Sequence, residues 1–208
     1  MPGTIANEFG FTRHEFAILR RLESPEKIQR FLDEEIVYDP SRTCRSPRRL
    51  LRDRRGHCVE GALLAATALR LRGQPPLIWD LHAQRDVDHV LALFRRDGLW
   101  GAIGKSNYSG LRYREPVYKT LRELAMSYFE HYFNAHGERT LRGYSRPILL
   151  SQFDATGWMT AEDDPWQIPN YLTTISYTQI IPRKVVSRLT RQDQRLRAAN
   201  EFGMQKAG

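Results

Sequence analysis

The sequence predicts an α+β fold in which a central helix packs on an antiparallel sheet. The run from 58 to 72 is rich in alanine and leucine and apolar on most sides, which is typical of a buried helix. Three short β-compatible runs follow at 77–81, 89–94 and 99–103. The tripeptide 96–98, Arg-Asp-Gly, joins the last two as a hairpin turn. A helix followed by hairpin-linked strands favours α+β over a parallel α/β sheet.

Additional helices are expected before the central one. Residues 1–24 form a loose or helical lead-in. A helix begins at Ser24-Pro25, where serine caps the helix and proline takes its first position. We expect this helix to end near Tyr38, because the residue before Pro40 disfavours helical geometry.

The second half of the chain is less regular. Pro116 opens an expected helix over 116–134 with an apolar face. The stretch 144–182 is rich in aromatic, proline and turn residues and allows no assignment beyond the β-branched content of 171–181. Residues 183–208 form a basic tail, expected to be helical over 185–202.

Length and composition favour one domain, with its core at about 25–182. A chain of 208 residues, 41% of them hydrophobic, can bury a hydrophobic core without the help of disulfides or a structural metal. The mean hydropathy is −0.55 and no run approaches the roughly 20 apolar residues of a membrane span. The N-terminus lacks a basic flank and an apolar signal core, which predicts a cytoplasmic protein that does not enter a membrane.

The chain has two cysteines, Cys44 and Cys58, without CxxC spacing. A structural disulfide or a structural zinc site is therefore not expected. Cys44 is interpreted as inert. A thiol reacts as its thiolate, and Cys58 stands at the expected start of the central helix, whose unpaired N–H groups and partial positive charge lower a thiol pKa. Gly56 allows a close approach, and the backbone N–H of Cys58 is a candidate oxyanion donor.

A thiol nucleophile needs a base, and His89 is the best candidate because strand starts lie at the rim of a sheet. If the turn centres on 97–98, Ser106 lies opposite His89 with Asn107 next to it, and either oxygen could orient the imidazole. A three-residue loop would instead align Lys105, which cannot accept a hydrogen bond. The adjacent His57 is expected to point elsewhere, with tuning of the thiolate or contact with substrate as alternatives.

Much of the net charge of +8 lies between residues 41 and 55, which contain seven arginines and one aspartate. Such a run is compatible with phosphate or nucleic-acid binding. It has no interleaved aromatic residues for base stacking, so a solvated basic face, or pairing with acids elsewhere, is favoured. The seven residues are Arg42, Arg45, Arg48, Arg49, Arg52, Arg54 and Arg55.

Taken in order, these motifs resemble the transglutaminase-like superfamily, relatives of papain-type cysteine proteases. The match covers roughly 25–107: a helix, Gly-x-Cys opening an alanine-rich helix, a strand, and Asp88-His89-Val90 before a hairpin. The resemblance implies a Cys-His-Asp or Cys-His-Asn triad, with Cys58 and His89 as its first two members. The family's acid commonly follows a tryptophan in the next strand. Trp100 is present, but Gly104 stands where that acid is expected, which leaves Ser106 or Asn107 as the third member.

The resemblance implies a thiol-dependent hydrolase or acyltransferase that acts on a peptide or amide bond and requires no metal or organic cofactor. The basic surroundings of Cys58 favour an acidic substrate. The alternative interpretation is a non-catalytic transglutaminase-like module that binds an acidic partner or nucleic acid through the arginine-rich segment.

Overall fold

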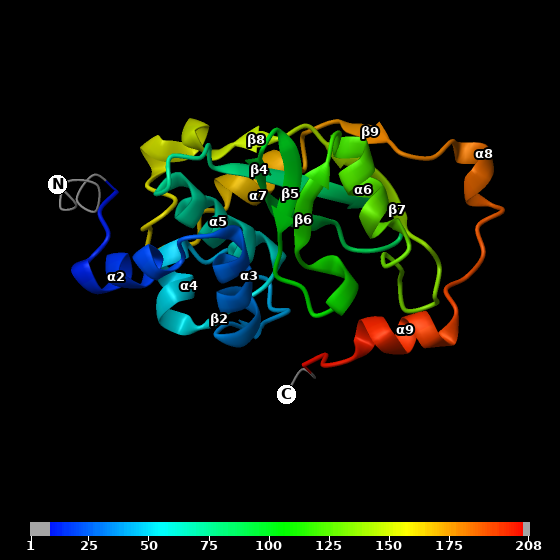
Figure 1. The fold of residues 1–208 in the computed structure, drawn as a ribbon, viewed down its shortest axis with the longest axis horizontal. Helices are drawn as coiled ribbons and strands as arrows, with labels where there is room; N and C mark the ends of the chain where they lie inside the picture. The colour runs from blue at the N-terminus through cyan, green and yellow to red at the C-terminus, as the bar shows by residue number, and fades with distance from the viewer. Residues whose placement is uncertain (1–8, 206–208) are drawn as a thin grey trace.

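The computed structural model describes residues 9–205, which form a seven-stranded antiparallel sheet with helices on both faces (Figure 1). The strands run in the order β6-β5-β4-β3-β7-β9, and β8 also pairs with β3. The α+β prediction is confirmed. The strands are β3 Leu77–Ala83, β4 His89–Arg96, β5 Leu99–Ile103, β6 Arg114–Tyr118, β7 Leu141–Ser145, β8 Ile148–Leu149 and β9 Tyr177–Gln179.

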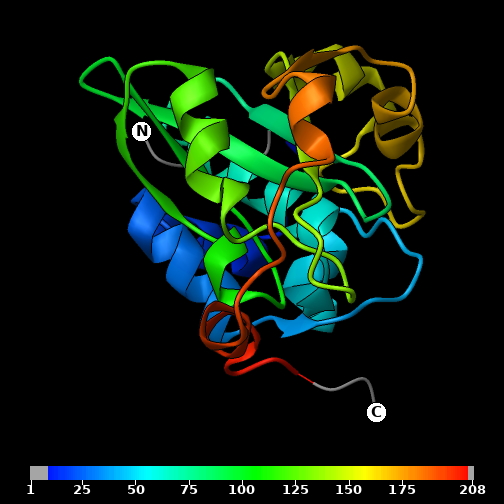
Figure 2. The same ribbon diagram turned by 90° about the vertical axis from the view of Figure 1, so that its right-hand side faces the viewer.

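Alternation along the strands divides the core into two layers. Ile78 and Ala92 point to the face covered by α5 (Cys58–Arg70), the predicted central helix. Trp79 and Leu91 point to the opposite face, covered by α6 (Leu121–Phe129). Figure 2 shows the two helices on opposite sides of the sheet. Because side chains alternate with a period of two, each strand contributes to both layers.

The remaining helices surround this sandwich, and α3 and α4 pack directly on α5. A two-stranded parallel ladder joins β1 (Val37–Tyr38) to β2 (Arg55–Gly56) beside them. Among the residues described, no helix has the length and apolar character needed to cross a bilayer. The other helices are α2 Arg13–Arg21, α3 Pro25–Glu34, α4 Pro47–Asp53, α7 Gln167–Leu172, α8 Arg183–Val186 and α9 Gln194–Glu201, with 3₁₀ turns η1 Ser109–Leu111 and η2 Leu150–Thr156.

The hairpin between β4 and β5 has the predicted turn. Asp97 and Gly98 take φ values of 52° and 81°, the left-handed conformation that a two-residue turn requires at both positions. The ladder runs from Arg96 opposite Leu99 to Ala92 opposite Ile103. This register would place residue 106 opposite residue 89, as predicted. The pairing of β4 with β5 ends at Ile103, however, and does not extend to residue 106.

The predicted start of the helix over 116–134 is wrong. Residues Arg114–Tyr118 form β6, an edge strand, where Pro116 is tolerated because its missing N–H need not join a ladder. The helix begins after Thr120, whose hydroxyl accepts a 3.1 Å hydrogen bond from the N–H of Glu123. This Thr-x-x-Glu capping box is a local signal that outweighs the proline.

Two further boundaries differ from expectation. Helix α3 ends at Glu34 rather than near Tyr38, because Val37 and Tyr38 pair with β2 and the buried Lys105 ammonium binds the carbonyls of Leu32 (2.6 Å) and Ile36 (2.5 Å). The arginine-rich segment contains α4, which begins at Ser46-Pro47 with the same cap signal as Ser24-Pro25.

The expected helix at 185–202 is two short ones. Helix α8 ends at Val186, and α9 begins only after Asp193, whose carboxylate accepts hydrogen bonds from the N–H groups of Arg195 and Leu196. Within 171–181, the extended part is β9, and residues 171–172 complete α7.

Candidate active site

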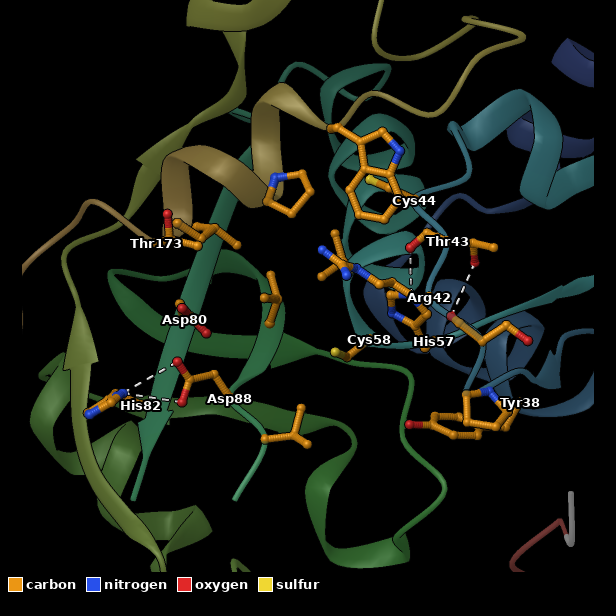
Figure 3. A pocket seen from close by; sticks show the side chains of 18 of the residues that line it. Tyr38, Arg42, Thr43, Cys44, His57, Cys58, Asp80, His82, Asp88 and Thr173 are labelled. Atoms are coloured by element: carbon orange, nitrogen blue, oxygen red, sulfur yellow. Dashed lines mark hydrogen bonds and ion pairs between the residues drawn. The ribbon is translucent and has the colours of Figure 1, made fainter. Parts of the chain in front are cut away.

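Cys58 is the first residue of α5 and lies in the wall of a cavity of about 730 Å³ (Figure 3). Its side chain is partly buried. The N–H groups of a first helical turn have no carbonyl partner within the helix, and they carry a partial positive charge. This confirms the placement of the thiol at a helix start and gives its anion a favourable field.

Two histidines lower the pKa of the Cys58 thiol. Burial alone would raise the pKa of Cys58, but hydrogen bonds from the side chains of His57 and His89 outweigh burial and lower this pKa to about 5. The same bond and charge raise the pKa of His57 to about 9, against the effect of its burial. His57 therefore does not point away from the thiol as expected. It lies beside Cys58 in Figure 3.

Backbone carbonyls hold both imidazoles in place. The Nε2 atom of His89 lies 2.7 Å from the carbonyl oxygen of Leu111, and the Nε2 atom of His57 lies 2.8 Å from that of Thr43. A carbonyl oxygen only accepts, so each Nε2 carries the proton. In the His89 ring, Nδ1 is then the nitrogen left for the thiol. This is the arrangement that orients a catalytic imidazole through a third group.

That third group is a main-chain carbonyl and not Ser106 or Asn107. The Ser106 hydroxyl accepts a 3.0 Å hydrogen bond from the N–H of Tyr108, and the Asn107 amide makes two hydrogen bonds with the backbone of Gln205. Both residues follow the point at which β5 leaves the sheet, so neither side chain is directed at His89.

Gly104, where the resemblance places an acid, lies directly against His89. A Cβ on Gly104 would be 3.3 Å from His89 Nε2 and only 2.3 Å from Leu91. The buried Gln29 amide fixes the Gly104 backbone through two hydrogen bonds of 2.9 and 3.0 Å. A side chain at position 104 would therefore collide with the sheet, and the Leu111 carbonyl takes the acceptor position that an acid would otherwise supply.

These placements give a first prediction about the thiol. Ser106→Ala and Asn107→Ala should leave the pKa of Cys58 within about half a unit of the wild-type value, because both side chains make their hydrogen bonds with the backbone of other residues. The pH dependence of iodoacetamide alkylation measures this pKa. A rise of a unit or more in either variant, with the fold intact by circular dichroism, would return that residue to the site.

Glu60 organises the start of the helix. Its carboxylate is fully buried and accepts hydrogen bonds from the N–H of His57 (2.8 Å), the N–H of Arg45 (2.7 Å) and the hydroxyl of Thr43 (2.8 Å). The Arg45 guanidinium lies 3.3 Å away. Gly56 is required here, because a Cβ would lie 2.6 Å from a Glu60 carboxylate oxygen. The loop carrying the Thr43 carbonyl is thus tied to the helix that carries the thiol.

The arginine-rich segment is largely paired with acids, which is the interpretation that the sequence favoured. Six of its seven arginines lie within 4 Å of a carboxylate. Arg45 forms ion pairs with three carboxylates, those of Asp39, Asp53 and Glu60. The seventh, Arg42, lines the cavity with its guanidinium 6.0 Å from the ring centre of Trp166. These charges fasten α4 and its neighbours to the body of the protein.

Cys44 and Lys105 are structural. Burial raises the pKa of the Cys44 thiol, and the nearby Glu60 and Asp164 carboxylates add to the rise. Lys105 is buried with its ammonium on the carbonyls of Leu32 and Ile36, and this burial lowers its pKa to about 8.

The far wall of the cavity contains residues that the sequence did not single out. Asp80 on β3 and Tyr177 on β9 line it, and the Tyr177 hydroxyl donates a 2.8 Å hydrogen bond to Asp80 Oδ2. His82 stacks on the Tyr177 ring at 4.6 Å between ring centres. The only local signal was an aspartate in the middle of an otherwise apolar strand run.

No protein-family model matches this chain, and no curated protein matches it at a significant level.

Proposed function

We propose that the protein is a thiol-dependent hydrolase or acyltransferase of transglutaminase-like type that acts on an amide bond. The observation that carries this proposal is the Cys58 thiol at a helix start, with hydrogen bonds from two imidazoles that lower its pKa to about 5. Perturbed pKa values in a cavity are typical of functional sites. A merely structural cysteine, such as Cys44, has the opposite shift.

In the proposed reaction, the Cys58 thiolate attacks the amide carbonyl and forms a thioester. An imidazolium returns a proton to the departing amine, and an imidazole then removes a proton from water or from an acceptor amine that resolves the thioester. His89 takes this acid–base role, because its ring is held on a strand by the Leu111 carbonyl. His57, with a pKa of about 9, carries a positive charge at neutral pH and stabilises the thiolate. The N–H groups of the first turn of α5 face the developing oxyanion.

The non-catalytic alternative depends on free arginines in the segment 42–55. Six of the seven are engaged in ion pairs, several of them partly or fully buried, which leaves little free charge for a nucleic acid backbone. The geometry therefore favours the enzyme. Binding of a nucleic acid that weakens steeply with salt and is lost on replacing Arg42 would favour the alternative.

Thiol alkylation tests the proposal without knowledge of the substrate. We expect iodoacetamide to modify Cys58 with a pH midpoint near 5, because the thiolate is the reacting species. The Cys44→Ser variant should keep this profile and Cys58→Ser should lose it. Mass spectrometry of the labelled peptide identifies the site.

A midpoint near the ordinary thiol value of about 8.5 would contradict the proposal. So would equal labelling of Cys44 and Cys58 at pH 6, because burial raises the pKa of Cys44 and should leave it protonated there.

A further inference from the structure

Asp80 occupies a position where an apolar residue is expected. It pairs with Val90 in the ladder and so points to the α5 face of the sheet, as does the fully buried Ile78 two residues earlier. The Asp80 side chain is only 2% exposed, yet it lines the cavity that holds Cys58. A carboxylate in a core position costs stability unless something compensates it.

The polar contacts of Asp80 are incomplete. Its Oδ2 atom accepts the 2.8 Å hydrogen bond from Tyr177, whose hydroxyl also lies 3.3 Å from the Leu172 carbonyl. Its Oδ1 atom is buried and has no hydrogen-bond partner among the described residues. Buried polar atoms are nearly always satisfied, so such an atom on a cavity wall calls for a ligand donor.

Charges of both signs act on Asp80, and the neighbouring carboxylate is one of them. Asp88 lines the same cavity, although its carboxylate is engaged by His82 at 3.2 Å and by the N–H of Ala83 at 2.7 Å. Burial raises the pKa of Asp80 to about 7, and the charges of Asp88 and of the Cys58 thiolate contribute to the rise, whereas the hydrogen bond from Tyr177 and the charge of His89 oppose it. Two other cationic groups, His57 and Arg42, lie across the cavity in Figure 3.

Apolar side chains also line the cavity, among them Val90, Pro169 and Leu172, and they offer no charge that could compensate the carboxylate. A neutral N–H donor would satisfy Oδ1 but leave the negative charge buried. An ammonium group would satisfy both, because it brings the opposite charge and three donors.

We propose that Asp80 binds an ammonium group of the substrate, so that the site selects amide or ester substrates that carry a free amine. The substrate class rests on the proposed acyl transfer at Cys58, whereas the amine site itself does not. An ammonium bound to a carboxylate stays protonated, so this group anchors the substrate and is not the amine that attacks the thioester. Asp80 is thus a specificity-determining residue.

The probe is n-pentylammonium, with 1-pentanol as its uncharged counterpart, and the readout is binding by calorimetry to the full chain at pH 8. We expect the amine to bind the wild type at least tenfold more tightly than it binds Asp80→Asn. The alcohol should bind both proteins equally and weakly. Asp163→Asn, at an exposed acid that does not line the cavity, should bind the amine as the wild type does. Because binding is measured without acyl transfer, failure of the thiol chemistry would leave this result intact.

Equal amine affinity in the wild type and Asp80→Asn would overturn the proposal, as would equal affinity of the wild type for amine and alcohol. Loss of binding in Asp88→Asn alone would move the site to Asp88. Asp80→Asn should fold, because it removes a buried charge, and its melting temperature at pH 8 should be no lower than that of the wild type. If it does not fold, amine affinity of the wild type must still fall as pH drops through about 7, where Asp80 is protonated.

Discussion

The double variant His57→Gln/His89→Gln is expected to raise the pKa of the Cys58 thiol from about 5 to about 8.5 or above. Both imidazoles hydrogen-bond the thiol and both lower its pKa, whereas burial acts in the opposite direction. Glutamine is polar but carries no charge. Without the imidazoles, burial is opposed only by the helix field, which is worth about 1 kcal/mol or less. A shift of more than three pKa units corresponds to about 5 kcal/mol of lost preference for the thiolate.

Each single variant separates the two contributions. His57→Gln and His89→Gln should each raise the midpoint by about one to two units, because each leaves one imidazole on the sulfur. The midpoint of the pH profile is the readout, and not the rate at one pH, because a more basic thiolate is also a stronger nucleophile. The ultraviolet absorbance of the thiolate gives the same midpoint independently.

The matched control is His14→Gln/His136→Gln, which removes two exposed histidines. It should leave the midpoint near 5. A double site variant that keeps a midpoint near 5 would show that the helix N-terminus alone activates the thiol, and it would remove both histidines from the mechanism.

Local signals carried the parts of this fold that could be predicted. The cap and proline at 24–25, the alanine-rich run after Cys58 and the Asp97-Gly98 turn each act within a few residues, and each element begins where expected. The predictions were wrong where one local signal is compatible with two kinds of structure. Pro116 is compatible with a first helical turn and with an edge strand, and only pairing with β5 decides between them.

The sequence could predict those residues of the candidate site whose side chains have a recognisable local position. Cys58 and His89 stand at the starts of regular elements, but the group that orients His89 is the carbonyl of Leu111, which any residue could supply. Tyr177 and Asp80 are 97 positions apart in the sequence, so no local pattern around either residue predicts the hydrogen bond between them. The strongest missed signal was Glu60, which is three residues after His57 and could have been read as a capping acid.

Glu60→Gln is expected to lower the free energy of unfolding by about 3–5 kcal/mol, because it breaks a fully buried ion pair from one side. The carboxylate accepts from two backbone N–H groups and a hydroxyl and faces the Arg45 guanidinium. A glutamine offers one acceptor oxygen in place of two. Its amide nitrogen would face N–H donors, and the charge of Arg45 would lose one of its carboxylates.

Urea unfolding of Glu60→Gln and of Glu162→Gln gives this comparison directly. Glu162 also pairs with an arginine, Arg52, at 2.8 Å, but both side chains are more than half exposed, at 61% and 55%. Its loss should therefore change stability by no more than about 1 kcal/mol. Where Glu60→Gln remains folded, the pKa of Cys58 should also rise, because the Thr43 carbonyl that holds the His57 ring belongs to the loop that Glu60 fastens. Equal stability of the two variants would mean that the buried Glu60 network does not stabilise the fold, and an unchanged pKa of Cys58 in Glu60→Gln would mean that this network does not support the His57 ring.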